Sequence, residues 1–231
     1  MIKGSLCPSA RWVGKRGNQE RFCIVFMEDL QTASPGKDGG VRLILASASP
    51  RRRELLEMLG VKHFEIIPAL GEELPHPELS PEELVRELSR AKASEVAAAL
   101  DDPEAVVIGA DTVVAVDGAV LGKPKDTEDA HRMLRLLSGR THEVFTGVTV
   151  LRGGQVTTAS ERTAVHFRAL TCSEIDAYVA TGEPLDKAGA YGIQGRASLF
   201  AEGIEGDFFN VMGLPVCLLG KILGKLGVVL L

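Results

Sequence analysis

The sequence has little cysteine, few histidines and no surplus of positive charge. Its 231 residues include four cysteines, and because no two stand at CxxC spacing, we expect neither a structural zinc site nor a disulfide framework. The five histidines show no HExxH or HxxxH spacing, which argues against a metal bound by imidazole. The net charge of −5 argues against nucleic acid as a partner, because nucleic-acid binders usually carry a basic face.

Long apolar runs are also missing. None approaches the ~20 residues that a membrane span needs, and no charged-then-apolar signal peptide opens the chain, so we expect a cytoplasmic protein with no membrane partner. Residues 1–40 hold the only tryptophan and end in a glycine-rich stretch. Their apolar segment Phe22 to Met27 is too short to predict a strand. We therefore expect an N-terminal extension, followed by one domain over residues 41–231. Hydrophobic residues make up 45% of the whole chain, which is enough for a substantial core.

The stretch from Val41 to Gly60 predicts a strand, a tight loop and a helix. An apolar run ends at Ala46, Ser49 is a favourable N-cap whose hydroxyl can accept from the first turn, and Pro50 suits the first helical position. Three arginines (51–53) then occupy a turn where the helix dipole already favours negative charge. Free amides, serine hydroxyls and the first two guanidinium groups together predict a phosphate site, while nearby glutamates can neutralise the third arginine.

Local patterns predict the remaining elements. Capping boxes at Ser80 and Thr171 mark two helix starts, and glycines mark several turns. Parallel strand–helix units come first and antiparallel hairpins follow, which predicts an α/β fold with a mixed twisted sheet, flanking helices and two lobes. The other predicted strands are at 64–68, 106–110, 113–116, 119–121, 144–151, 163–167 and 198–200. The helix that starts after Ser80 runs to about Leu100, and its inward residues are Leu84, Leu88, Ala91 and Val96. The other predicted helices are one capped by Thr127, with Ala130, Met133, Leu134 and Leu137 on one face, a short one ending at Gly182, and a closing one at 215–226.

Asp111 directly follows an apolar run. A carboxylate at the end of a buried strand costs several kcal/mol of desolvation unless it is paired or bound to a metal. Lys123 follows one hairpin later, where the returning strand can bring it alongside, near the first helix N-terminus. This favours a reactive site, with an aspartate that caps a turn as the structural alternative. Lys92 shares the helix face of Leu88, where a lysine lying along the core edge is the simpler interpretation.

The loop Gly182 to Gly195 reads GEPLDKAGAYGIQG. It holds too many glycines for a helix or strand and is too long for a plain connection. Loops of that length inside compact domains are usually functional.

Four stretches in order resemble the Maf family of nucleotide pyrophosphatases. They are SASPRRRELLEMLG (Ser47 to Gly60), GADTVVAVDGAVLGKP (Gly109 to Pro124), LSGRTHEVFTGV (Leu137 to Val148) and TGEPLDKAGAYGIQG (Thr181 to Gly195). The resemblance covers the chain from about residue 41 onward. It implies an ITPase-like fold with a nucleotide cleft between the two lobes. It also implies hydrolysis of a nucleoside triphosphate to the monophosphate and pyrophosphate with Mg²⁺ or Mn²⁺, which would remove non-standard or excess nucleotides.

The resemblance assigns roles to individual residues. Asp111 matches the catalytic acid–base residue, and Lys123 matches the lysine of the family's GKP motif. Glu73 matches the glutamate of an acidic pair, with Glu72 where the family usually has aspartate, and the divalent cation would be held by Glu73 and Asp111. The phosphate-binding positions match Ser47, Arg51, Arg52 and Lys92. The positions tied to substrate choice match Arg51, Thr112 and Gln194.

The loop from Ala188 to Gly195 resembles the subgroup that acts on dTTP and UTP. The Gln194 amide offers both an acceptor and a donor, which suits the N3–H and O4 groups of thymine or uracil. A glutamine that only ties down its own loop is the structural alternative. For the whole chain, a nucleotide-binding regulator of septum formation with little turnover and a phosphatase of phosphate monoesters stay open, as does a homodimer.

Overall fold

The computed structural model describes residues 41–61, 63–71, 76 and 78–230. The expected extension at residues 1–40, with Phe22 to Met27, lies outside this range, and so do Glu72 and Glu73. The described residues form one compact unit. In the part of the chain that the structure describes, no helix combines the length and apolar character that crossing a membrane requires.

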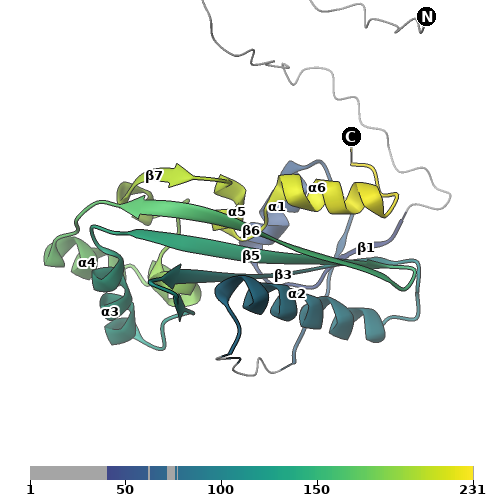
Figure 1. Ribbon diagram of the computed structural model, residues 1–231, viewed down its shortest axis with the longest axis horizontal. Helices are drawn as coiled ribbons and strands as arrows, with labels where there is room; N and C mark the ends of the chain where they lie inside the picture. Colours follow the sequence, from purple (N-terminus) through teal and green to yellow (C-terminus); the bar gives the residue numbers. More distant parts are fainter. Residues whose placement is uncertain (1–40, 62, 72–75, 77, 231) are drawn as a thin grey trace, which may run out of the picture. The chain divides into compact units, whose positions relative to one another are not determined.

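A seven-stranded mixed sheet organises this unit (Figure 1). Its strand order is β2-β1-β3-β5-β6-β7, with β4 paired to β3. β1 pairs in parallel with β2 and β3, and all other pairs are antiparallel. The strands are β1 (Leu43–Leu45), β2 (Glu65–Ile66), β3 (Val106–Val116), β4 (Ala119–Leu121), β5 (Thr141–Arg152), β6 (Gln155–Phe167) and β7 (Ala201–Glu205).

Helices cover both faces of the sheet. α2 lies along one face, while α1 and α6 lie on the other, and α3 and α4 gather at the opposite end of the sheet from α6 (Figure 1). This arrangement confirms the predicted α/β class with a mixed sheet and flanking helices. The helices are α1 (Pro50–Met58), α2 (Pro81–Ala98), α3 (Thr127–Leu137), α4 (Cys172–Val179), α5 (Phe208–Met212) and α6 (Val216–Lys225), with short 3₁₀ helices η1 (Glu183–Asp186), η2 (Ala188–Ala190) and η3 (Arg196–Leu199).

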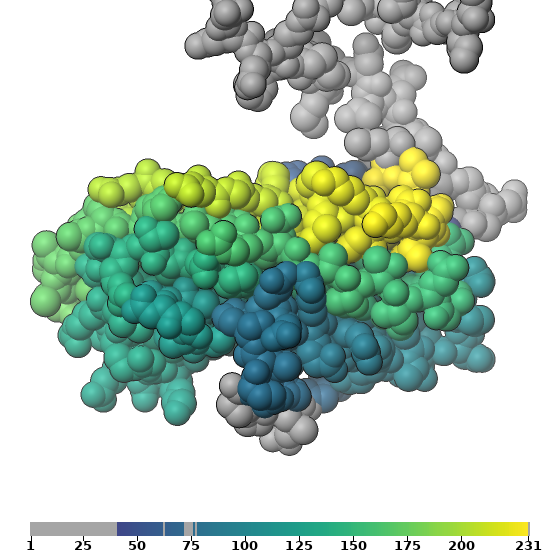
Figure 2. Space-filling view, in the orientation of Figure 1, coloured from purple at the N-terminus to yellow at the C-terminus, as the bar shows by residue number. Residues whose placement is uncertain are grey.

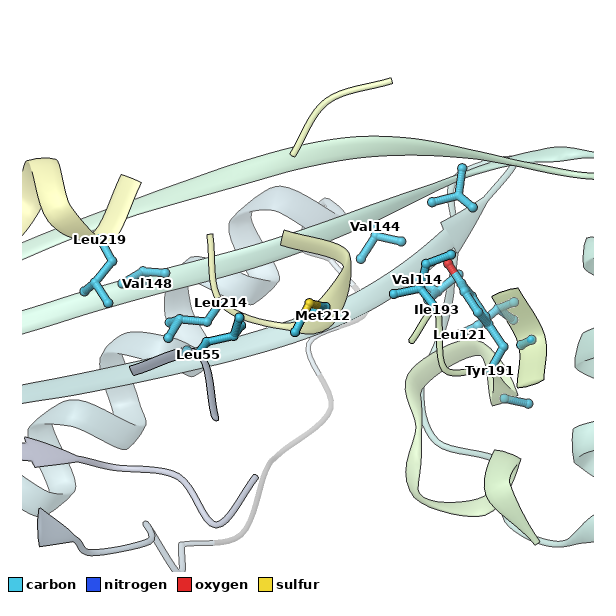
Figure 3. Packing of buried hydrophobic residues seen from close by; sticks show 14 of the residues in the cluster. Leu55, Val114, Leu121, Val144, Val148, Tyr191, Ile193, Met212, Leu214 and Leu219 are labelled. Carbon is cyan, nitrogen blue, oxygen red and sulfur yellow. The ribbon is translucent and has the colours of Figure 1, made fainter. Parts of the chain in front are cut away.

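The hydrophobic core is divided by the sheet because successive side chains of a strand point to opposite faces. In β3, Ala110 and Val114 belong to the larger cluster with α1, α5 and α6, whereas Val107 and Val113 pack on the α2 side. Figure 3 shows the larger cluster, with Leu219 of α6 close to β5. In the space-filling view, α2 (blue) and α6 (yellow) cover different parts of the surface (Figure 2). Consecutive residues of β3 therefore face different helices.

Two glycines let α2 lie unusually close to the sheet. A Cβ atom added at Gly147 of β5 would stand 2.0 Å from the carbonyl oxygen of Val85, and one added at Gly109 would stand 2.4 Å from that of Ser89. Both distances are far below van der Waals contact, so any side chain at these positions would push α2 away. Gly147 is the register partner of Asp111, and this close approach therefore occurs beside that residue.

Several predicted elements are confirmed by the structure. The strand–loop–helix unit forms, and Gly60 adopts φ +81° just beyond α1. The capping boxes at Ser80 and Thr171 both form, with each side chain accepting from the third backbone amide of its helix. The turn at 153–154 joins β5 to β6, and α3 buries the four predicted residues. These features all depend on residues a few positions apart.

Other predictions are wrong in part or in full. Val96 is buried on the inward face of α2 as predicted, whereas Leu84 and Leu88 are only partly buried and Ala91 is exposed. The rest of the buried face is formed by Val85, Ser89 and Ala93. Small side chains occupy the contact because the sheet glycines bring α2 so close. Residues 198–200 are not a strand: η3 covers this region and β7 starts at 201.

Three helix details also differ from prediction. Asp126, not Thr127, is the N-cap of α3, where its side chain accepts from the amide of Asp129. Ser49 is the N-cap of α1, but its side chain makes no capping hydrogen bond. The short helix α5 had no counterpart in the prediction.

Candidate functional site

The candidate site lies where β3 changes its neighbour. Along one edge, β1 pairs with Val106 to Ile108, and β4 pairs with Val114 to Val116. Among the described residues, the segment between them has no strand partner on this edge, while β5 pairs along the other edge throughout. Asp111 stands at the centre of this gap. The prediction that Asp111 ends a strand is wrong. Asp111 lies inside the 11-residue strand β3, which continues past it.

The Asp111 carboxylate faces α2, where Lys92 forms an ion pair with it. Only 11% of the Asp111 side chain and 21% of the Lys92 side chain are exposed. The ammonium group offsets part of the cost of burying a carboxylate. Lys92 is therefore not simply a lysine lying along the core edge, while the phosphate-binding role that the family resemblance implies for it stays a prediction. The ion pair depends on the close packing of α2 that Gly109 and Gly147 permit.

Arg52 organises the other face of the same gap. Its Nη1 donates to the Ser47 hydroxyl at 2.9 Å, its Nη2 to the Thr112 hydroxyl at 3.1 Å, and its Nε to the Gly213 carbonyl at 2.8 Å. The guanidinium group thus joins the loop after β1, the middle of β3 and the end of α5. Three predicted site residues, Ser47, Arg52 and Thr112, form one hydrogen-bonded group.

A buried polar network supports this group from below. The Thr112 and Thr146 hydroxyls are 2.9 Å apart, and the Thr146 hydroxyl donates to the Asn210 carbonyl at 2.9 Å. The Asn210 amide nitrogen donates in turn to the Val144 carbonyl and to the Thr163 hydroxyl, both at 2.9 Å. Sequence reasoning missed these residues. The alternation of β5 places Thr146 among buried valines, which could have identified it, whereas Asn210 lies in a short helix without a sequence signal.

Arg51 contacts the glycine-rich loop. Its Nη1 lies 3.5 Å from the Asp186 carboxylate, and Lys187 donates to the same carboxylate at 2.6 Å. Burial alone would raise the pKa of Asp186, but the Lys187 hydrogen bond and the charges of Lys187 and Arg51 hold this pKa below its usual value. The Gly189 amide donates to the Gly122 carbonyl at 3.0 Å. The loop therefore borders both the arginine helix and the segment that carries Lys123.

Two predicted residues take no part in these hydrogen-bonded groups. Lys123 and Gln194 are exposed, and neither has a hydrogen bond or ion pair with another described residue. The lysine that pairs with Asp111 is therefore Lys92 of the preceding helix. A nucleotide cleft at the gap stays a prediction.

The residues at the gap suit a hard divalent cation. No group of three or more histidine, cysteine, aspartate or glutamate side chains that could hold a metal occurs among the described residues. The gap itself offers the carboxylate of Asp111 on the α2 face of the sheet, and oxygen is the donor that Mg²⁺ and Mn²⁺ prefer. Further ligands would come from the phosphates of a bound nucleotide and from Glu73, which lies outside the described residues.

A family model described as Maf-like protein matches residues 42–226. The chain belongs to the Maf family. The match includes every predicted site residue, and so the Asp111–Lys92 pair and the Arg52 group lie inside the Maf domain.

The similarity to curated relatives extends over nearly the whole length of those relatives. The "dTTP/UTP pyrophosphatase" of Moorella thermoacetica is 55% identical over 189 residues, which span 81% of this Maf chain and 96% of that protein. The "dTTP/UTP pyrophosphatase" of Bacillus pumilus is 51% identical over 187 residues, which span 81% and 97%. Among solved structures, a HAM1 protein from Coxiella burnetii is 12% identical and has a TM-score of 0.45, over 80% of this chain and 100% of that one.

Proposed function

We propose that this Maf protein hydrolyses nucleoside triphosphates, preferring dTTP and UTP, to the monophosphate and pyrophosphate. The observation that carries the proposal is the gap at the centre of β3, where the largely buried Asp111–Lys92 pair lies on one face of the sheet and the Arg52 group on the other. Relatives with 51–55% identity over 96–97% of their length carry the name of that activity.

The charges at the gap suit a triphosphate. A triphosphate brings about four negative charges, and its transition state is stabilised mainly by positioning and by opposite charge. Arg51 and Lys123 have exposed or partly exposed side chains that can reach outward to phosphates. Arg52 is held by three hydrogen bonds, so its guanidinium group is oriented before the substrate arrives. Such preorganisation avoids a reorganisation cost during the reaction.

Asp111 would act as the base that removes a proton from the attacking water. Water then attacks the α-phosphorus, the bond to the bridging oxygen breaks, and pyrophosphate leaves. Lys92 keeps the Asp111 carboxylate in place, and its ammonium group would also contact the phosphates. A bound Mg²⁺ or Mn²⁺ ion, held by Asp111 and Glu73, would add positive charge and lower the pKa of the attacking water.

Gln194 would select the base. Its side chain is exposed on the glycine-rich loop, where no described residue occupies its amide. The amide can therefore pair with N3–H and O4 of uracil or thymine at once. Once a bound base has displaced water from this amide, a base that cannot complete both hydrogen bonds would leave a polar group unpaired, and this makes such discrimination strong.

One assay tests the proposed function. The full chain is incubated with Mg²⁺ or Mn²⁺ and each of dTTP, UTP, CTP, ATP, GTP and 7-methyl-GTP, and pyrophosphate is distinguished from orthophosphate. We expect pyrophosphate, formed fastest from dTTP and UTP. Orthophosphate as the first product would indicate a phosphatase, and binding without turnover would indicate a nucleotide-binding regulator.

The Gln194→Ala variant tests the base reader in the same panel. We expect the preference for dTTP and UTP to narrow while hydrolysis of other nucleotides continues. An equal loss for all nucleotides, accompanied by a lower melting temperature, would show that Gln194 only supports its loop.

A further inference from the structure

Glu183 lies beneath the turn that carries Gln194 and holds it at two points. Its Oε1 accepts from the Tyr178 hydroxyl at 3.0 Å, and its Oε2 accepts from the Arg196 amide at 3.3 Å. The Tyr178 oxygen itself accepts from the Gly192 amide at 3.1 Å. One carboxylate thus fixes the backbone on both sides of Gln194, directly after it and through Tyr178 before it.

The two glycines of the turn are fitted to side chains below them. A Cβ atom added at Gly195 would stand 2.0 Å from the Glu183 Oε1, and one added at Gly192 would stand 2.6 Å from the Lys187 Cε. Gly195 thus makes room for the Glu183 carboxylate, so the turn and the carboxylate form one unit.

The same unit is connected to the arginine helix. The Lys187 ammonium donates to the Glu183 carbonyl and to the Asp186 carboxylate, both at 2.6 Å, and Asp186 contacts Arg51. Only 3% of the Tyr178 surface is exposed, so Tyr178 is a rigid support for the turn. The turn is therefore anchored at its base while the Gln194 side chain itself is exposed.

We propose that Glu183 is a positioning residue for base selection: its carboxylate sets the orientation of the Gln194 turn, so that the amide can pair with a uracil or thymine edge. The inference rests on the proposed function, because it assumes that Gln194 reads the base. Bidentate pairing demands a defined orientation, and an exposed side chain can have one only if its backbone is fixed. In Glu183→Gln one carboxylate oxygen becomes an NH₂ donor, so either the Arg196 amide or the Tyr178 hydroxyl would lose its acceptor.

The test compares UTP with CTP, which differ at the edge that Gln194 would contact. The kcat and KM values are measured for wild type, Glu183→Gln, Gln194→Ala and the double variant. We expect Glu183→Gln to lower the UTP/CTP ratio of kcat/KM at least about five-fold, the low end for removing a partner from a hydrogen-bonded group. The kcat for CTP should change little, because the residues at the Asp111 gap are untouched.

The double variant separates positioning from general support. If Glu183 acts through Gln194, adding Glu183→Gln to Gln194→Ala should not change the UTP/CTP ratio further. Glu174→Gln is the matched control, since Glu174 also accepts from a backbone amide and side chains but serves the start of α4. It should leave the ratio at the wild-type value.

A second variant covers the case in which Glu183→Gln does not fold. Tyr178→Phe keeps the buried ring and removes the hydroxyl between Glu183 and the Gly192 amide, and it should lower the UTP/CTP ratio in the same direction. A wild-type UTP/CTP ratio in Glu183→Gln would overturn this inference but not the proposed function. If Glu183→Gln does not fold, a wild-type ratio in Tyr178→Phe would do the same. An equal loss for UTP and CTP would also overturn the inference. Wild-type protein without a UTP preference would instead contradict the proposed function, and the inference with it.

Discussion

His142 should make the stability of this protein sensitive to acid. The side chain is 1% exposed in β5, its Nε2 lies 2.8 Å from the Tyr191 hydroxyl oxygen, and its ring packs edge-on against Phe167 at 4.8 Å between centroids. Its Nδ1 has no hydrogen-bond partner among the described residues. Burial, aided by the charge of His166, lowers the pKa of His142 from 6.5 to about 4. The folded protein therefore holds His142 neutral.

The direction of the effect follows from proton binding. Because the folded pKa lies below the unfolded one, the unfolded state binds more protons as the pH falls below 6.5. The contribution to the free energy of unfolding is complete above about pH 6.5 and is lost as the pH falls toward 4. A pKa depression of this size corresponds to about 3 kcal/mol, of which more than about 2 kcal/mol should be lost by pH 4.5.

The assay is urea unfolding of wild type and His142→Gln at a series of pH values between 4.5 and 7.5. We expect the free energy of unfolding to fall less steeply with acid in His142→Gln, by more than about 2 kcal/mol over this range. His63→Gln is the control, because His63 is exposed, and its profile should follow wild type. Parallel profiles for wild type and His142→Gln would refute the assignment of a buried neutral histidine.

Three further predictions concern the site and its support. Asp111→Asn should lower turnover at least ~100-fold with folding intact, and near-normal turnover would remove Asp111 from the role of base. Gly147→Ala should lower the free energy of unfolding by about 3 kcal/mol, since its Cβ would stand 2.0 Å from the Val85 carbonyl oxygen. Gly220→Ala is the control, because no atom lies within 4 Å of its added Cβ, and it should raise the free energy of unfolding by about 0.5–1 kcal/mol. Equal effects of the two changes in urea unfolding would contradict this reasoning. Deleting residues 1–40 should leave melting temperature and activity nearly unchanged, and a large loss of either would show that these residues belong to the folded domain.

Local features of the fold could be predicted from the sequence because they depend on neighbouring residues. The capping boxes at Ser80 and Thr171 need only a hydroxyl and a glutamate three positions later. The buried face of α3 follows from its helical spacing. The arginine-rich start of α1 similarly indicated an anion site before any contact was known, because the charge pattern conflicts with the helix dipole.

Contacts between distant segments could be decided only by the tertiary structure. The sequence favoured Lys123 as the neighbour of Asp111, but the structure pairs this carboxylate with Lys92 because α2 packs on the face toward which Asp111 points. That packing depends on Gly109 and Gly147, whose missing side chains allow the helix to approach. The same close approach favours small residues such as Ser89 and Ala93 on the inward face of α2, where hydrophobic periodicity had correctly placed Val96 but had also placed Leu88. Sequence periodicity specifies which side of an element is apolar, whereas strand register and helix–sheet distance specify which side chains meet, and these depend on the packing of the whole sheet.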